Sequence, residues 1–191
     1  MQIRIHAVEK NITTLGPGRR FGIWVQGCDR KCPGCMSPET WNPKGGTLYN
    51  TSELAEMFLH SGCDGITISG GEAFLQPDAL AEVIRLSGNP GVIIYTGFLY
   101  EELLLRQDAA PLLAVCDLLI DGAFIQKLQD GKNLRGSSNQ RALPLTDRYR
   151  ETAASAGTMP AQIEFFLHDN VTRLVGIPSP EWLERVKKIN W

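Results

Sequence analysis

Three cysteines lie within eight residues of one another, in the pattern C-x3-C-x2-C formed by Cys28, Cys32 and Cys35. They follow an apolar run over residues 21–25, which predicts a loop delivered by a buried strand. A short loop with this spacing can turn several thiolates toward one inorganic centre. Structural zinc sites and fully protein-ligated iron–sulfur clusters normally take four protein ligands. A group of three on a cubane cluster therefore leaves one iron free to bind a substrate or cofactor.

The composition is that of an ordinary globular protein. The chain has 191 residues, of which 43% are hydrophobic and 21% are charged, so we expect a single domain over residues 1–191. Its net charge of −2 gives no electrostatic argument for nucleic acid or a membrane surface. No apolar run approaches the ~18–20 residues that span a bilayer, and the first residues lack the layout of a signal peptide. Five cysteines, an odd number with three clustered, argue against a secreted disulfide framework and predict a cytoplasmic protein.

Strand and helix signals alternate through the middle of the chain. Apolar runs predict strands at residues 21–25, 65–69, 92–95 and 118–120. Helical patterns separate these strands, at residues 51–61, 77–87 and 99–114, the last interrupted near Pro111. Such alternation implies right-handed crossovers and a parallel sheet. Because parallel sheets place their sites at the carboxyl ends of the strands, we expect the functional groups at those strand ends.

The flanking regions are less regular. Residues 2–7 form a short alternating stretch, and residues 36–50 contain two Pro and two Gly, which predicts irregular structure. Residues 141–145 are compatible with a further parallel strand. Residues 162–167 and 171–177 predict a hairpin, and a terminal helix beginning at Ser179-Pro180 has Trp182 on its apolar face.

A second motif, Ser69-Gly70-Gly71-Glu72, follows the strand expected at residues 65–69. Together with the cysteine motif it resembles the radical S-adenosylmethionine enzymes. Within that superfamily the chain is most similar to the activating proteins of anaerobic ribonucleotide reductases. This finer resemblance is carried, in order, by motifs at residues 16–19, 27–35, 40–41, 69–72, 95–97, 117–122 and 135–141.

The resemblance implies an α/β fold, namely a partial, open (β/α) barrel of parallel strands with a C-terminal β-hairpin and helix. It implies that Cys28, Cys32 and Cys35 hold a 4Fe-4S cluster and that S-adenosylmethionine chelates the fourth iron. Reductive cleavage of that cofactor then produces a 5′-deoxyadenosyl radical. The radical abstracts hydrogen from a glycine of a partner enzyme, and a reductant such as flavodoxin or ferredoxin supplies the electron.

The resemblance also assigns cofactor-binding roles to the residues of the Gly-Gly turn. Ser69, Gly70, Gly71 and Glu72 are expected to bind the amino group of the methionine moiety, with Glu72 either accepting from that group or supporting the turn. The family's usual proline after this glutamate is Ala73 here, which makes the turn less rigid but removes no ligand.

Further residues are expected around the rest of the cofactor. Gly34 and Met36 flank the last cysteine, where the family places backbone against the adenine. Thr96, Asp121 and Asn139 are candidates for the ribose and carboxylate ends. Asp121 has an alternative interpretation as a helix cap, since a buried carboxylate requires partners. Arg141 either pairs with the cofactor carboxylate or faces solvent.

Several alternatives stand beside this interpretation. Zinc with a remote fourth ligand such as Cys63 is the other inorganic centre, whereas Cys63 and Cys116 are otherwise expected to be buried thiols. The three histidines share no motif, which predicts surface or packing roles. The alternative function is a radical S-adenosylmethionine enzyme that modifies a peptide or small metabolite. A non-enzymatic iron–sulfur electron carrier is the third hypothesis, but it has no need of the motif at residues 69–72.

Overall fold

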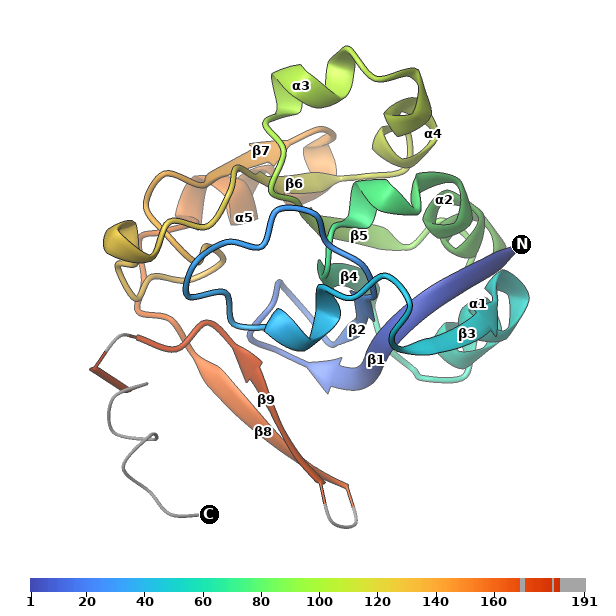
Figure 1. The fold of residues 1–191 in the computed structure, drawn as a ribbon, viewed down its shortest axis with the longest axis horizontal. Helices are drawn as coiled ribbons and strands as arrows, with labels where there is room; N and C mark the ends of the chain where they lie inside the picture. The colour runs from blue at the N-terminus through green and yellow to red at the C-terminus, as the bar shows by residue number, and fades with distance from the viewer. Residues whose placement is uncertain (169–170, 180, 183–191) are drawn as a thin grey trace.

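The computed structural model describes residues 1–168, 171–179 and 181–182, and its centre is a seven-stranded open sheet (Figure 1). The strand order is β3-β1-β2-β4-β5-β6-β7. The strands are β1 (Gln2–Ile12), β2 (Arg20–Val25), β3 (Thr47–Asn50), β4 (Gly65–Gly70), β5 (Gly91–Tyr95), β6 (Leu118–Asp121) and β7 (Arg141–Pro144). The central strands β2, β4, β5 and β6 are parallel, and the pairs outside them are antiparallel. The predicted α/β class, with an open arrangement of parallel strands, is confirmed, and the strands of the described residues do not close into a barrel.

The helices follow the strands much as the sequence predicts. They are α1 (Thr51–Leu59), α2 (Pro77–Leu86), α3 (Tyr100–Leu104), α4 (Ala110–Leu113) and α5 (Arg150–Ser155). Helix α1 begins after Asn50, whose backbone N–H donates to Glu53 Oε2 at 2.8 Å, so that Asn50 and Glu53 form a capping box. Pro77 stands at the first position of α2, where its missing N–H costs no helical hydrogen bond. The helical region expected at residues 99–114, with an interruption near Pro111, consists of α3, a 3₁₀ turn (Gln107–Ala109) and α4, which begins one residue before Pro111.

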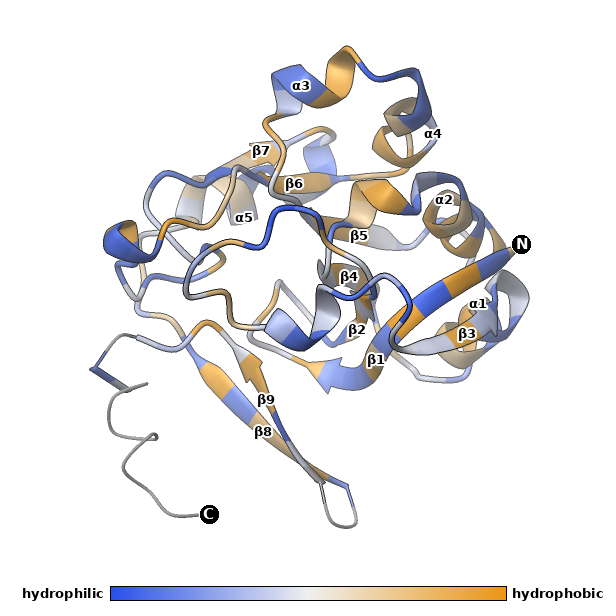
Figure 2. Ribbon diagram, in the orientation of Figure 1, coloured by the Kyte–Doolittle hydropathy of each residue, from blue (hydrophilic) through white to orange (hydrophobic). Residues whose placement is uncertain are grey.

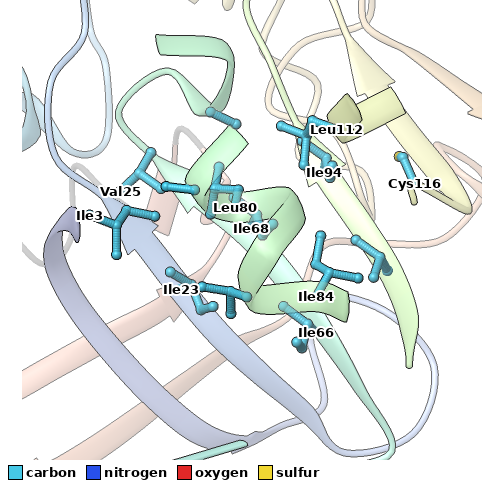
Figure 3. Close-up of a cluster of buried hydrophobic side chains, with 14 of the residues drawn as sticks. Ile3, Ile23, Val25, Ile66, Ile68, Leu80, Ile84, Ile94, Leu112 and Cys116 are labelled. Carbon is cyan, nitrogen blue, oxygen red and sulfur yellow. The ribbon is translucent and has the colours of Figure 1, made fainter. Parts of the chain in front are cut away.

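The core lies between the sheet and the layer formed by α1, α2 and α4. Alternate strand side chains, such as Ile23, Ile68 and Ile94, meet Leu80 and other apolar side chains of that layer (Figure 3). Each fully buried aliphatic side chain contributes about 1.5–3 kcal/mol. The same alternation is visible as orange and blue bands along β1 in Figure 2. This layer leaves the other face of the sheet for the remaining elements.

Helix α5 and the C-terminal hairpin pack on that other face. Ala153 of α5 packs with Ile93 and Ile120, whereas Val175 packs with Ile12 and Leu15. The hairpin consists of β8 (Ile163–His168) and β9 (Val171–Gly176), an antiparallel pair that forms its own two-stranded sheet (Figure 1). The predicted hairpin is therefore confirmed. Most of the expected terminal helix lies outside the described residues.

The alternating stretch at residues 2–7 is part of the longer strand β1. Two expectations about the flanking regions are wrong. Residues 36–50, expected to be irregular, include strand β3 and a 3₁₀ turn (Pro38–Thr40). Strand β7 is antiparallel to β6, with Arg141 opposite Asp121. A parallel strand requires a long crossover, usually helical, to the other end of the sheet. The connection from β6 holds only a short 3₁₀ turn (Gln126–Leu128). The chain therefore enters β7 beside the carboxyl end of β6, and the two strands are antiparallel.

Candidate active site

The cysteine loop leaves β2 at the carboxyl edge of the sheet and is fastened at its base. The backbone N–H of Gly27 donates to Thr40 O at 2.7 Å, and that of Cys28 donates to Trp41 O at 3.2 Å. Gly27 and Gly34 have φ of 98° and 75°, which glycine adopts without strain. The returning segment therefore closes the loop into a compact turn that holds the cysteines beside the strand ends.

A cavity of about 520 Å³ opens between this loop and the sheet edge. All three cysteines of the motif line it. So do most of the other residues that the sequence singles out, namely Met36, Ser69, Gly70, Gly71, Glu72 and Thr96. Gly34, Asp121 and Asn139 are not among its lining residues. The structure thus brings loops after β2, β4 and β5 around one space.

The cysteines face this cavity without converging on a point. Among the described residues, no three His, Cys, Asp or Glu side chains gather closely enough to hold a single metal ion. Cys63 and Cys116 directly precede β4 and β6, so they lie at the amino ends of the parallel strands. The cysteine loop lies at the opposite, carboxyl ends of these strands. A zinc site that recruits Cys63 is therefore incompatible with the fold. A multi-iron cluster suits the donor set better, because each thiolate then needs to meet only its own iron.

The Gly-Gly turn is bonded directly to the cysteine loop. Gly71 N–H donates to Val25 O, and Glu72 N–H donates to Gly27 O, each at 2.8 Å. A Cβ at Gly71 would stand 2.2 Å from Gly27 O, so no other residue permits this approach. The two motifs, more than thirty residues apart in the chain, therefore form one rigid unit through their backbones.

Glu72 supports the turn from within. Its carboxylate is buried and accepts from Phe74 N–H at 3.1 Å, from the Thr96 hydroxyl at 2.7 Å and from Gly97 N–H at 2.8 Å. Burial raises the pKa of Glu72, and these three hydrogen bonds oppose that shift. The carboxylate thus joins the loops after β4 and β5, and the Thr96 hydroxyl is committed to it. This arrangement corresponds to the supporting role for Glu72.

The side chains of Asp121 and Arg141 also bond to other parts of the chain, and neither residue lines the cavity. Asp121 is fully buried and accepts from Tyr100 N–H, at the start of α3, at 2.8 Å. The Arg141 guanidinium makes two hydrogen bonds to Asp121 and also pairs with Glu101. Burial and pairing here correspond to the helix-capping interpretation, because both carboxylate oxygens of Asp121 accept hydrogen bonds from within the chain.

Asn139 and Gly34 lie outside the cavity wall, but each shapes a nearby loop. Asn139 Nδ2 donates to Ala123 O at 2.8 Å, while its buried Oδ1 has no partner among the described residues. Gly34 lies against the Gln126 side chain, and a Cβ there would come within 2.6 Å of it. The loop after β6 therefore packs directly against the cysteine loop.

The floor of the cavity includes Trp24 and Tyr95, two side chains that the sequence interpretation did not assign to the site, together with Ser69, which it did. Strand register places Trp24 beside Ser69, and Tyr95 follows on the neighbouring strand. All three line the cavity, on the face opposite the helical layer. The Tyr95 hydroxyl is buried and has no hydrogen-bond partner among the described residues. Strand alternation alone could have identified Trp24 and Tyr95.

The last wall is strand β9, which comes from the far end of the chain. Residues 172–177 all line the cavity. The hairpin is held by Arg173, which donates to Val8 O at 2.8 Å and to Glu9 Oε2 at 3.1 Å. His168 Nε2 lies 2.6 Å from the same carboxylate oxygen, so this histidine pairs across to β1. No sequence motif marked this segment as part of the site.

The residues present suit an iron–sulfur cluster with an organic cofactor. Three thiols supply ligands for three irons, and the turn at residues 70–71, which has no side chains, lines the cavity. The orphaned Tyr95 hydroxyl offers a hydrogen bond to a polar molecule above the floor. Burial raises the pKa of the Cys28 thiol in the free chain, and bonding to iron favours its thiolate form.

Comparisons with known proteins agree with this chemistry. A family model described as a 4Fe-4S single cluster domain matches residues 14–143, which include the cysteine loop and the Gly-Gly turn but not the hairpin. The chain is similar to the anaerobic ribonucleoside-triphosphate reductase-activating protein of Enterobacteria phage T4, with 32% identity over 142 residues, covering 69% of this chain and 88% of the relative. The protein of the same name from Escherichia coli K12 is 32% identical over 139 residues, covering 65% and 88%. The pyruvate formate-lyase-activating enzyme of Clostridium pasteurianum is 36% identical over 146 residues, covering 70% and 59%.

Proposed function

Because the chain belongs to the radical S-adenosylmethionine activating proteins, iron–sulfur enzymes that act on glycyl-radical enzymes, we propose that its substrate is a glycine of an anaerobic ribonucleotide reductase. The observation that carries this proposal is that the cysteine loop and the Gly-Gly turn line one cavity and are bonded to each other. The relatives covered to 88% of their length are named for activating this class of reductase.

Within this proposal Cys28, Cys32 and Cys35 ligate the 4Fe-4S cluster. The cluster and S-adenosylmethionine supply the chemistry when bound, namely one-electron cleavage to methionine and a hydrogen-abstracting 5′-deoxyadenosyl radical. Ser69, Gly70 and Gly71 present the turn to the methionine end of the cofactor. Met36 serves the adenine end. Glu72 and Thr96 hold the two turns in place from behind.

The remaining residues exclude water and orient the reactants. Trp24 and Tyr95 form the floor, and the Tyr95 hydroxyl donates to a polar atom of the bound cofactor or substrate. The β9 wall closes the side that the sheet leaves open. Such enclosure matters because a carbon radical reacts with whatever C–H bond lies nearest, so its target must be positioned first.

The wider setting of the enzyme is also part of the proposal. No helix among the described residues is long and apolar enough to cross a membrane. An exposed cysteine loop requires a reducing environment, which supports a cytoplasmic location. A flavodoxin or ferredoxin supplies the electron, and residues 1–191 act as one domain.

Ligand assignment is tested first, by iron and sulfide analysis after anaerobic reconstitution. About four irons per chain are expected, as one cubane requires. Cys28→Ala, Cys32→Ala and Cys35→Ala should each lose the cluster. Cys63→Ala and Cys116→Ala, at the amino ends of β4 and β6, are matched controls and should retain the cluster. Loss of iron in either control would show that the ligand set is wrong.

Electron paramagnetic resonance tests the substrate. Reduced enzyme and S-adenosylmethionine, mixed with the cognate reductase, should produce a stable glycyl radical in the reductase. A reductase with Gly→Ala at its target position is the control and should give no signal. Rapid 5′-deoxyadenosine formation without a radical in the reductase would favour the alternative, a peptide- or metabolite-modifying enzyme.

A further inference from the structure

Strand β9 meets the cavity along its edge. Side chains of a β-strand point alternately to opposite faces, so a cavity lying against one face touches every second residue. Here five consecutive residues of β9, 172–176, line the cavity, and so does Ile177 directly after the strand. Continuous lining of this kind arises when the space lies beside the backbone. The cavity therefore borders the strand's hydrogen-bonding edge.

That edge has no strand partner among the described residues. Strand β9 pairs with β8 alone, from Ile163 opposite Gly176 to His168 opposite Val171. No residue of β8 lines the cavity, so the cavity lies on the side of β9 away from β8. In an antiparallel pair, every second residue directs both its N–H and its C=O away from the partner strand. Those groups of β9 face the cavity.

The edge is held in place from two sides. Glu164 of β8 accepts from the backbone N–H and the hydroxyl of both Thr13 and Thr14, at 2.8 to 3.2 Å. Arg173 is tied to β1 through Glu9 and Val8 O. The guanidinium is therefore occupied on the β1 side, and Val175 is buried against the sheet face. A fixed edge on which Arg173 and Val175 are engaged elsewhere offers its backbone to a ligand.

We propose that β9 binds the extended segment around the target glycine of the partner enzyme by strand addition. This inference rests on the proposed function and names how the same site recognises its protein substrate. Strand addition supplies affinity through main-chain hydrogen bonds, which every peptide can make. It also sets the position of each Cα along the edge, since residues of a strand advance by about 3.3 Å each. A glycine paired there presents its Cα hydrogens beside the cysteine loop with no side chain in the way.

The test is a backbone N-methylation scan of the substrate segment. A fluorescent peptide of about nine residues, a common strand length, is centred on the glycine of the cognate reductase. Its binding to the cluster-loaded enzyme with S-adenosylmethionine is measured by anisotropy. N-methylation removes one N–H without changing a side chain. We expect at least tenfold weaker binding at every second position and less than about twofold change between them, because only alternate N–H groups face β9.

Hydrogen exchange in the complex with the intact reductase gives an independent readout. Alternate amides among residues 172–177 should slow on complex formation, while amides of β8 should not change. Failure of the unmodified peptide to bind, uniform tolerance of N-methylation, or unchanged β9 exchange would each overturn strand addition. A glycyl radical that still forms in the intact reductase would show that only this inference has failed. Absence of that radical would remove the proposed function itself.

Discussion

Replacing Glu72 with alanine tests whether this carboxylate belongs to the framework or to the cofactor. The buried carboxylate accepts from Phe74 N–H, Gly97 N–H and the Thr96 hydroxyl. The hydroxyl can turn elsewhere, but the two N–H groups are left without an acceptor, at about 1–3 kcal/mol each. Removing a buried charge offsets part of this loss of stability, because burial disfavours the charged form and raises the pKa of Glu72. We expect a net loss of about 3 kcal/mol, a large share of a typical stability of about 5–15 kcal/mol.

The assay is urea unfolding of the cluster-free chain, followed by far-ultraviolet circular dichroism. Glu56→Ala, at an exposed position on α1, is the matched control and should change stability by less than about 0.5 kcal/mol. Thr96→Val should be non-additive with Glu72→Ala, because the two side chains share one hydrogen bond. S-adenosylmethionine binding to the cluster-loaded variants is measured by anaerobic calorimetry. Unchanged stability with a tenfold loss of cofactor affinity would refute the framework role and place Glu72 on the cofactor.

Three further substitutions probe the framework around the site. Burial would raise the pKa of Glu164, but hydrogen bonds from two threonines outweigh it and lower the pKa below 4.5. Its stabilising effect is therefore complete above pH 4.5 and is lost as the pH falls through the lowered value. In Glu164→Gln, the thermal midpoint of the cluster-free chain should fall less steeply from pH 7 to pH 3; an identical profile would contradict this. Arg20→Met should lower the free energy of unfolding in urea by about 3 kcal/mol, because it removes a buried guanidinium that makes four hydrogen bonds. Their acceptors are Ile66 O, Gly91 O, Thr67 and Tyr149. The iron content should not change. Asp121→Asn should cost about 3 kcal/mol, because it replaces one buried acceptor oxygen by an NH2 group that faces the donors Arg141 or Tyr100 N–H. S-adenosylmethionine affinity should stay within about twofold; a tenfold loss of affinity at unchanged stability would restore Asp121 as a ligand.

Most of the fold class follows from short stretches of the sequence. The apolar runs, the capping pattern at Asn50 and Glu53 and the hairpin periodicity are local signals, and each produced an element near its expected position. The orientation of β7 was not available in this way. Direction in a sheet depends on where the connecting chain crosses, and residues 122–140 carry no periodic pattern that shows this.

By itself the sequence determined the chemistry of the site, because the spacing of Cys28, Cys32 and Cys35 constrains a single loop. It also determined that the Gly-Gly turn follows the next strand of a parallel sheet. Only the tertiary structure decided what each polar side chain contacts. Glu72 and Asp121 are buried and bonded within the framework, and β9 reaches the cavity from the far end of the chain. A carboxylate takes whichever donors lie within hydrogen-bond distance, and contacts between distant segments exist only once the sheet has brought them together.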